Sequence, residues 1–194
     1  LDPLRYYLIK EVSFGNDGNI SQERLEDCIN SDLANNFGNL CQRVCAFAIR
    51  NCDSKIPEKI QFQNDDLKIL NEYTQNLDEI RSEIDNQNIN YYIDYIVNRL
   101  FEANKYFNDQ EPWKKKDDII RLNTIVYTTL EIVRKITYLL YPIIPHSSLK
   151  ALGLFNLKEK DIIFDTIKDN EFLKKGGDIN KIDILFNKIE RKND

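Results

Sequence analysis

Hydrophobic residues recur at spacings of three and four along most of the chain, which places them on one side of a helix. Such stripes occupy residues 33–47, 67–84, 92–107 and 119–140. The connectors are short, and the 194 residues include only 5 prolines and 6 glycines. Four to five amphipathic helices with short connectors predict an all-α helical bundle.

Capping and turn residues organise the N-terminal part. Asp2-Pro3 predicts the start of a short helix, since the side chain of Asp caps helices and Pro suits their first turn. Residues 13–19, with two glycines, predict a loop. Ser21 then begins a helical stretch that reaches about Arg50, as one bent helix or as two consecutive helices.

The tail after residue 153 lacks a helical stripe. It carries two short apolar clusters, at 162–164 and 184–186, and a Gly176-Gly177 pair that we expect to be a flexible joint. We expect the tail to dock through its apolar clusters instead of building a second core. The expected organisation is a linker helix and loop at 1–20, the bundle at 21–153 and the tail at 154–194.

Composition and charge narrow the function. No uninterrupted apolar run approaches the about 18 residues of a membrane span, so we expect a soluble protein with no membrane partner. The net charge of −5 argues against broad, non-specific binding of nucleic acid, including DNA, because such binding is mostly neutralisation of phosphates. Seven acids against two bases give residues 64–85 a net charge of −5, which suggests an alternative function as a helical scaffold that binds a protein partner through this segment.

Residues with catalytic or metal-binding chemistry are scarce. The four cysteines form no Cys-x-x-Cys pair, and His146 is the only histidine, so we expect free thiols, no metal site and a cytoplasmic location. We expect His146 to cap a helix or lie on the surface. The chain contains no phosphate-binding glycine loop and no nucleophile motif, so we predict no catalytic residue in it.

A polar row of Asn35, Asn39 and Arg43 is the first candidate site. The spacing of four places these residues on one helix face, away from the apolar stripe. Amide and guanidinium groups can hydrogen-bond to the edges of unpaired bases. Gly38 lies on the same side and would let a partner's backbone approach. The alternative is an ordinary solvated helix face.

Trp113 is the second candidate. It follows Pro112 in a break between two helices and precedes three lysines, Lys114 to Lys116. A flat aromatic ring beside cations can stack on a splayed-out base and attract its phosphates. The alternative is a tryptophan packed over a helix junction. The two candidates form one site only if the bundle brings Trp113 close to Arg43.

Five groups of residues resemble, in order, one protein family. They are Leu4-Arg5-Tyr6-Tyr7-Leu8 with 11–18, Asn30-Ser31-Asp32-Leu33-Ala34-Asn35 with Gly38-Asn39-Leu40 and Arg43, residues 108–114 (NDQEPWK), Pro142-Ile143-Ile144-Pro145, and residues 185–190 (LFNKIE). Together they are similar to the region that follows the catalytic domain in bacterial methionyl-tRNA synthetases. The resemblance spans nearly the whole chain.

The resemblance implies the anticodon-binding helical bundle of a class I synthetase, which recognises the CAU anticodon of methionine tRNA. The residues matching Asn39 and Arg43 contact anticodon bases in that family. The residue matching Trp113 stacks under the first anticodon base, and the one matching Asn35 lies in the same patch. Pro112 would fix the approach to Trp113.

The same resemblance defines what this chain lacks. The ATP-binding signatures of the family are absent, so the chain resembles a fragment whose N-terminal catalytic domain is the missing partner. ATP and Mg²⁺ would be used by that parent enzyme, with no cofactor in this part. Ser13 replaces the family's usual Pro and Asn19 its common Asp, both in the linker. With no appended dimerisation module, we expect a monomer.

Overall fold

The computed structural model describes residues 1–13, 15–18 and 20–190. Phe14 and Asn19 of the expected linker, and the last four residues of the expected tail, lie outside the described residues. Within the described residues the fold is helical and contains no strand, which confirms the all-α prediction. No helix among them is both long and apolar enough to cross a membrane.

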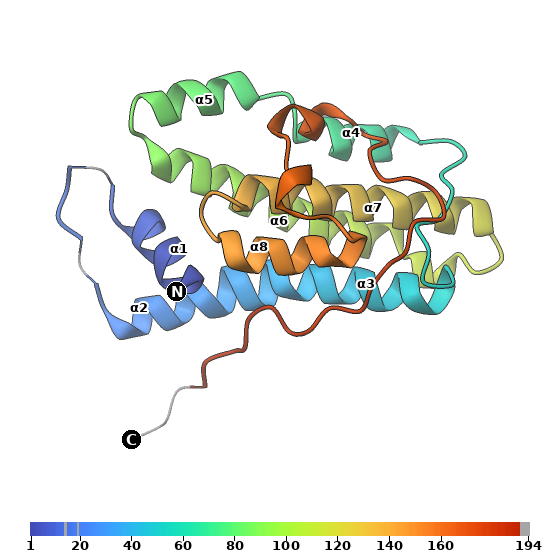
Figure 1. Cartoon of the computed structure of the whole chain (residues 1–194), viewed down its shortest axis with the longest axis horizontal. Coiled ribbons are helices and arrows are strands. Elements are labelled where there is room, and N and C mark those ends of the chain that lie inside the picture. The colour runs from blue at the N-terminus through green and yellow to red at the C-terminus, as the bar shows by residue number, and fades with distance from the viewer. Residues whose placement is uncertain (14, 19, 191–194) are drawn as a thin grey trace.

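The helices pack as a bundle around α7 (Figure 1). The longer elements are α1 Asp2–Glu11, α2 Gln22–Cys28, η1 Ile29–Gly38, α3 Asn39–Asn51, α4 Asn64–Glu72, α5 Leu77–Asp85, α6 Ile89–Gln110, α7 Ile119–Leu140 and α8 Pro145–Leu152. Short 3₁₀ turns are η2 Pro112–Lys114, η3 Gly153–Phe155, η4 Glu159–Asp161 and η5 Phe164–Lys168.

The stretch from α2 to α3 is one continuous helical run whose middle, η1, is π-helical. The run begins after Ser21, whose side chain accepts a hydrogen bond from the Arg24 backbone N–H (3.2 Å). A π-helix forms i→i+5 hydrogen bonds, so its side chains point in other directions than those of an α-helix. Here the buried carboxylate of Asp32 accepts hydrogen bonds from Tyr6 (2.9 Å) and Lys10 (2.6 Å). The π-helical segment is therefore tied to α1.

The single helix expected over 67–84 is wrong. A turn at 73–76 divides it into α4 and α5. The Thr74 hydroxyl donates to the Asn71 carbonyl (2.9 Å), a local bond that competes with helix propagation. The Tyr73 hydroxyl donates instead to the Arg99 carbonyl of α6 (2.9 Å), so tertiary contacts hold the turn. The apolar spacing continues across the break, which is why it suggested one helix.

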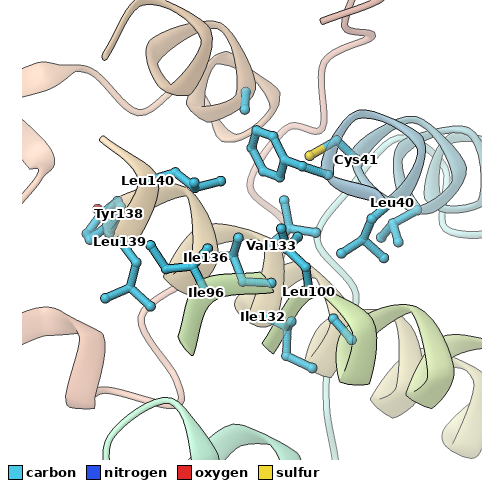
Figure 2. Packing of buried hydrophobic residues seen from close by; sticks show 14 of the residues in the cluster. Leu40, Cys41, Ile96, Leu100, Ile132, Val133, Ile136, Tyr138, Leu139 and Leu140 are labelled. Carbon is cyan, nitrogen blue, oxygen red and sulfur yellow. The ribbon is translucent and has the colours of Figure 1, made fainter. Parts of the chain in front are cut away.

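α7 forms the centre of the core. Figure 2 shows its Val133 and Ile136 packed between Leu40 of α3 and Ile96 of α6. The expected stripe faces these neighbours. The opposite side of α7 is also covered, since every residue from Thr124 to Leu140 is buried. A helix with one apolar stripe is thus enclosed on all sides.

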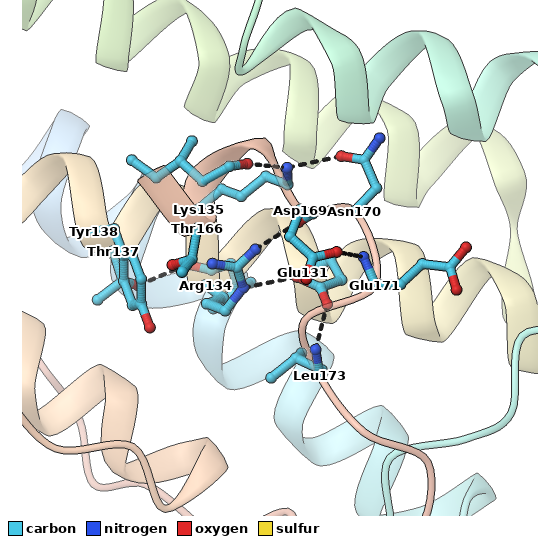
Figure 3. Close-up of polar contacts among 12 residues, drawn as sticks. Glu131, Arg134, Lys135, Thr137, Tyr138, Thr166, Asp169, Asn170, Glu171 and Leu173 are labelled. Atoms are coloured by element: carbon cyan, nitrogen blue, oxygen red, sulfur yellow. Dashed lines mark hydrogen bonds and ion pairs between the residues drawn. The ribbon is translucent and has the colours of Figure 1, made fainter. Parts of the chain in front are cut away.

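Three charged side chains of α7, Glu131, Arg134 and Lys135, have no exposed surface. The Arg134 Nε donates to Glu131 (2.7 Å), and its Nη2 donates to the Asp169 carbonyl of the tail (2.8 Å) (Figure 3). The Leu173 backbone N–H donates to Glu131 (2.6 Å). Tail backbone groups thus satisfy charges that would otherwise be costly to bury.

Lys135 extends the same arrangement. Its Nζ donates to the side-chain oxygen of Asn170 (2.7 Å) and to the Ile167 carbonyl. Burial, reinforced by the nearby Arg134, lowers the pKa of Lys135 to about 8. The tail between residues 167 and 173 is therefore held by hydrogen bonds to α7 as well as by apolar contact.

The expected docking of the tail by two apolar clusters is only partly right. Ile163, Phe164 and Ile184 of those clusters are exposed. The buried apolar anchors of the tail are Ile167, Leu173, Ile179 and Phe186. The local backbone conformation determines which tail side chains reach the core. The composition of the tail does not reveal that conformation.

The Gly176-Gly177 pair is pinned rather than free. The Gly176 N–H donates to the Ile56 carbonyl (2.9 Å), and the Ile56 N–H donates to the Gly177 carbonyl (2.8 Å). Gly176 adopts φ +80, a left-handed conformation that glycine adopts without a steric cost. The pair therefore forms a tight turn against the connector that follows α3.

The last described residues run back along η1 and α3 (Figure 1). The Asn30 side chain both donates to the Ile189 carbonyl (3.0 Å) and accepts from its N–H (2.8 Å). Phe186 packs against Phe37, with ring centroids 6.4 Å apart. A Cβ on Gly38 would lie 3.6 Å from the Phe186 ring and 3.0 Å from the Leu33 carbonyl oxygen. The side chains of Leu185 and Phe186, from this chain's own tail, occupy the space beside Gly38, so Gly38 does not mark a partner site.

Replacing Arg134 with Met should lower the free energy of unfolding by about 3–5 kcal/mol, because Glu131 would remain buried without its cation. Urea unfolding followed by circular dichroism would measure the change. Lys150→Gln, on the exposed surface of α8, serves as a control and should change it by less than about 0.5 kcal/mol. A loss no larger than the control's would contradict the assigned role.

Candidate nucleic-acid interface

A hollow of about 640 Å³ lies where the C-terminal half of α3 meets the end of α6 and η2. It is lined by Arg43, Ala46, Phe47, Arg50, Asn51, Phe107, Trp113 and Lys116, and we call it the Trp113 hollow. Figure 1 shows these three elements meeting at one end of the bundle, opposite α1. The fold therefore brings Arg43 and Trp113 to one cavity.

Phe107 stands at the centre of this hollow. Its ring meets Trp113 edge to face, with centroids 6.1 Å apart and planes at 74°. Phe47 meets the same ring at 5.9 Å and 85°. Trp113 retains 39% of its surface exposed, so the indole is braced by packing and still open to a ligand. Edge-to-face contacts of this kind are favourable for aromatic pairs.

Arg43 is held over the same aromatic group. Its guanidinium carbon lies 5.6 Å from the Phe107 ring centroid, within the range of a cation–π contact. Its Nη2 donates to the Asn108 side-chain oxygen (2.6 Å). An arginine has five N–H donors, so most of the fork has no partner among the residues that the structure describes. Two contacts thus fix the orientation of Arg43 without using up its hydrogen-bonding capacity.

The loop that carries Trp113 begins with a sharp turn. Glu111 ends α6 in the left-handed conformation (φ +43), and Pro112 follows, buried, at the start of η2. The Lys114 ammonium forms an ion pair with Glu111 (2.7 Å). Of the three lysines after Trp113, only Lys116 lines the hollow. Pro112 is therefore packed at the start of the loop. Lys114 is engaged by Glu111, whereas Lys116 borders the hollow.

The two asparagines of the candidate row lie farther along the helix. Asn39 begins α3, one turn before Arg43, and Asn35 belongs to the π-helical segment. Both are exposed, and neither makes a side-chain hydrogen bond within the described part of the chain. Neither lines the Trp113 hollow. Their amide groups extend a polar surface from the Trp113 hollow along η1 and the start of α3.

Several lining residues were not among the predicted site residues. Phe47 and Phe107 lie on apolar stripes, so their spacing suggested only core positions. Arg50 follows Arg43 by seven residues, the spacing that returns to one helix face, and this was the available signal. Lys116 was noted only as one of three lysines after Trp113, and the sequence could not tell which of the three lines the hollow because that depends on how the loop turns.

A buried ion pair fixes the loop from behind. Arg121, in the first turn of α7, donates two hydrogen bonds to the Asp66 carboxylate of α4 (2.6 and 2.9 Å). The Tyr106 hydroxyl of α6 also donates to Asp66 (2.5 Å). Arg121 further donates to the Gln110 side-chain oxygen (2.6 Å), just before the loop. Both ends of the loop are therefore anchored to α4.

These contacts alter the acidity of Asp66. Burial opposes ionisation, but the hydrogen bonds from Arg121, Tyr106 and the Gln63 backbone N–H outweigh it and lower the pKa of Asp66 below its usual 3.8. The native structure thus favours the carboxylate. Its contribution to stability is complete above pH 3.8 and is lost as the pH falls toward the lowered pKa.

The Trp113 hollow offers binding chemistry. Its charged residues are cations and its walls are aromatic, while no carboxylate or imidazole lines it. His146 lies exposed in the first turn of α8, away from the lining. Within the described residues no group of three His, Cys, Asp or Glu side chains could hold a metal ion.

The prediction of free thiols is confirmed, and burial raises the pKa of Cys28 to about 12.

Two family profiles match the chain. The profile described as the anticodon binding domain of methionyl tRNA ligase matches residues 56–194, and that of class I tRNA synthetases (M) matches residues 1–45. Arg43 falls within the second match and Trp113 within the first. The other lining residues from α3, at positions 46–51, lie between the two matches.

Similar proteins and structures agree with these profiles. The methionine–tRNA ligase of Mycobacterium leprae (strain TN) is 37% identical over 86% of this chain, and that of Rickettsia felis is 34% identical over 98%. The chain spans about a third of these relatives, 32% and 38% of their lengths. The apo crystal structure of Mycobacterium tuberculosis methionyl-tRNA synthetase superposes with a TM-score of 0.91 at 32% identity, over 98% of this chain and 39% of that one.

Acidification should test the Asp66–Arg121 pair. At neutral pH, Asp66→Asn should lower the free energy of unfolding by about 3–5 kcal/mol, because Arg121 would lose its buried partner. As the pH falls below 3.8, the Asp66 carboxylate of the unfolded wild type becomes protonated before that of the native protein, so the gap between the two proteins should narrow. Urea unfolding at a series of pH values would measure the difference in the free energy of unfolding. Asp65→Asn, at the exposed neighbouring position, is the matched control, and a gap independent of pH would refute the assignment.

Proposed function

The chain belongs to the anticodon-binding domain family of methionyl-tRNA ligases, and on that premise we propose that it binds the CAU anticodon of methionine tRNA at the Trp113 hollow. The observation that carries the proposal is that Trp113 and Arg43, from distant segments, pack on the same Phe107 ring. The rival hypothesis, a protein-binding scaffold using residues 64–85, has no support from the relatives described above, which are tRNA ligases.

Recognition would proceed by unstacking the anticodon. One base stacks on the exposed part of Trp113, where base–aromatic stacking is worth about 1–3 kcal/mol. The free N–H groups of Arg43 and the amide of Asn39 hydrogen-bond to the edges of neighbouring bases, and Asn35 extends the same surface. A wrong base would leave these polar groups unsatisfied on binding, which penalises it. Pro112 keeps the indole at the rim.

The parent protein would attach methionine to tRNA with ATP and Mg²⁺. This activity would reside in an N-terminal catalytic domain of the same chain, which would also contact the tRNA. We propose a cytoplasmic location, in keeping with four free cysteines. Because the net charge is −5, the chain alone should bind RNA weakly without those additional contacts.

A titration would test the proposal directly. An RNA stem-loop carrying CAU should bind more tightly than one carrying a scrambled anticodon. Trp113→Ala should weaken binding of the CAU stem-loop by about 5- to 150-fold, because the stacking surface is lost. Fluorescence anisotropy of a labelled stem-loop would measure both effects.

Phe101 provides a matched aromatic control for that titration. It is 66% exposed on α6 and does not line the hollow. Phe101→Ala should therefore leave the affinity unchanged. Equal affinity for the two stem-loops, or no loss with Trp113→Ala, would favour the scaffold hypothesis over anticodon binding.

Methionine activation gives a separate prediction. Because this chain has none of the family's ATP-binding signatures, it should catalyse no methionine-dependent exchange of pyrophosphate into ATP. Incubation with methionine, ATP, Mg²⁺ and labelled pyrophosphate would measure the exchange, with a full-length methionyl-tRNA synthetase as the positive control. Robust exchange by this chain would show that the catalytic machinery has been assigned to the wrong segment.

A further inference from the structure

The charge around the Trp113 hollow is of one sign. Its charged lining residues are Arg43, Arg50 and Lys116, in a chain whose net charge is −5. By contrast, the groove between α4 and α6 has acids and lysines on the same walls, for example Asp109 beside Lys105. A purely cationic rim therefore offers an anion a local site of favourable charge in a protein that is acidic as a whole.

The three cations of the hollow differ in what already engages them. Arg43 is oriented by Asn108 and Phe107. Arg50 and Lys116 are both exposed, and neither makes an ion pair or side-chain hydrogen bond with any residue that the structure describes. Lys114, two positions before Lys116, is paired with Glu111. Arg50 and Lys116 are therefore the cations available to a ligand.

Their positions flank the aromatic surface. Arg50 lies two helical turns beyond Arg43 on α3, and Lys116 follows Trp113 by three residues in the loop. A nucleotide joins a flat base to a phosphate through one sugar. A base stacked on Trp113 therefore brings a phosphate to the rim of the hollow, where these two side chains lie.

We propose that Arg50 and Lys116 bind a backbone phosphate of the RNA strand whose base stacks on Trp113. This inference rests on the proposed function and separates the residues that contact bases from those that contact phosphate. Arg43 and Asn39 contact base edges and so carry sequence preference, whereas contacts to phosphate fix position and carry none. Arg50 and Lys116 are thus positioning residues for the anticodon loop.

The salt dependence of binding tests this proposal. On single-stranded RNA each neutralised phosphate contributes about −0.7 to the slope of log K against log salt concentration. Arg50→Gln and Lys116→Gln should each make the slope shallower by up to about 0.7. Each should weaken the CAU and the scrambled stem-loop by the same factor. Arg43→Gln should instead reduce the preference for CAU. Anisotropy titrations from 50 to roughly 300 mM KCl would give both quantities.

Lys115→Gln is the matched control, because it removes the same charge from the same loop outside the hollow. It should leave the slope unchanged, and Arg50→Lys should retain the wild-type slope. Circular dichroism would verify that each variant is folded. An unchanged slope with Arg50→Gln and Lys116→Gln, or an equal change with Lys115→Gln, would overturn the phosphate site while leaving the CAU preference intact. Loss of the CAU preference in the wild type would instead overturn the proposed function.

Discussion

Glu131, Arg134 and Lys135 are enclosed at the centre of the bundle, and the arrangement of the C-terminal third depends on them. Burying three charges is unfavourable unless their hydrogen-bonding groups are satisfied. Backbone groups of residues 167–173 bond each of the three side chains, accepting from Arg134 and Lys135 and donating to Glu131, so the tail follows one path over α7. From there it reaches Ile56 and then runs back along η1. The tail is therefore an integral layer of the fold, which covers a face of α7 that would otherwise meet water.

The same constraint helps to hold the candidate nucleic-acid interface in place. α7 begins next to the Trp113 loop, and it is held by the tail along its C-terminal half and by the Asp66–Arg121 pair in its first turn. Phe107 then packs against Phe47, Trp113 and Arg43 at once. A binding surface on supported helices is held near its working geometry before the ligand arrives, which lowers the cost of ordering it.

Much of this architecture could be predicted from the sequence, because apolar spacing reports directly on helices packed against a core. The spacing did not reveal the break at Thr74, since apolar contacts continue across it. It also failed for α7, whose charged side is covered by a segment distant in sequence. At the interface, Arg43 and Trp113 could be singled out by their chemistry. Phe107 could not, because a ring in an apolar stripe looks the same whether it supports a ligand surface or fills a core.

The tail's role has a consequence for how the protein is made. During synthesis α7 emerges from the ribosome before residues 167–173, which hold the groups that satisfy its charges. Until those residues emerge, the nascent bundle exposes one side of its central helix. Native closure is thus postponed until residues 167–173 have been synthesised, and contacts between residues as far apart as Asn30 and Ile189 slow it further. A ribosome that stalls shortly after α8 would leave a nascent chain prone to aggregation and to degradation.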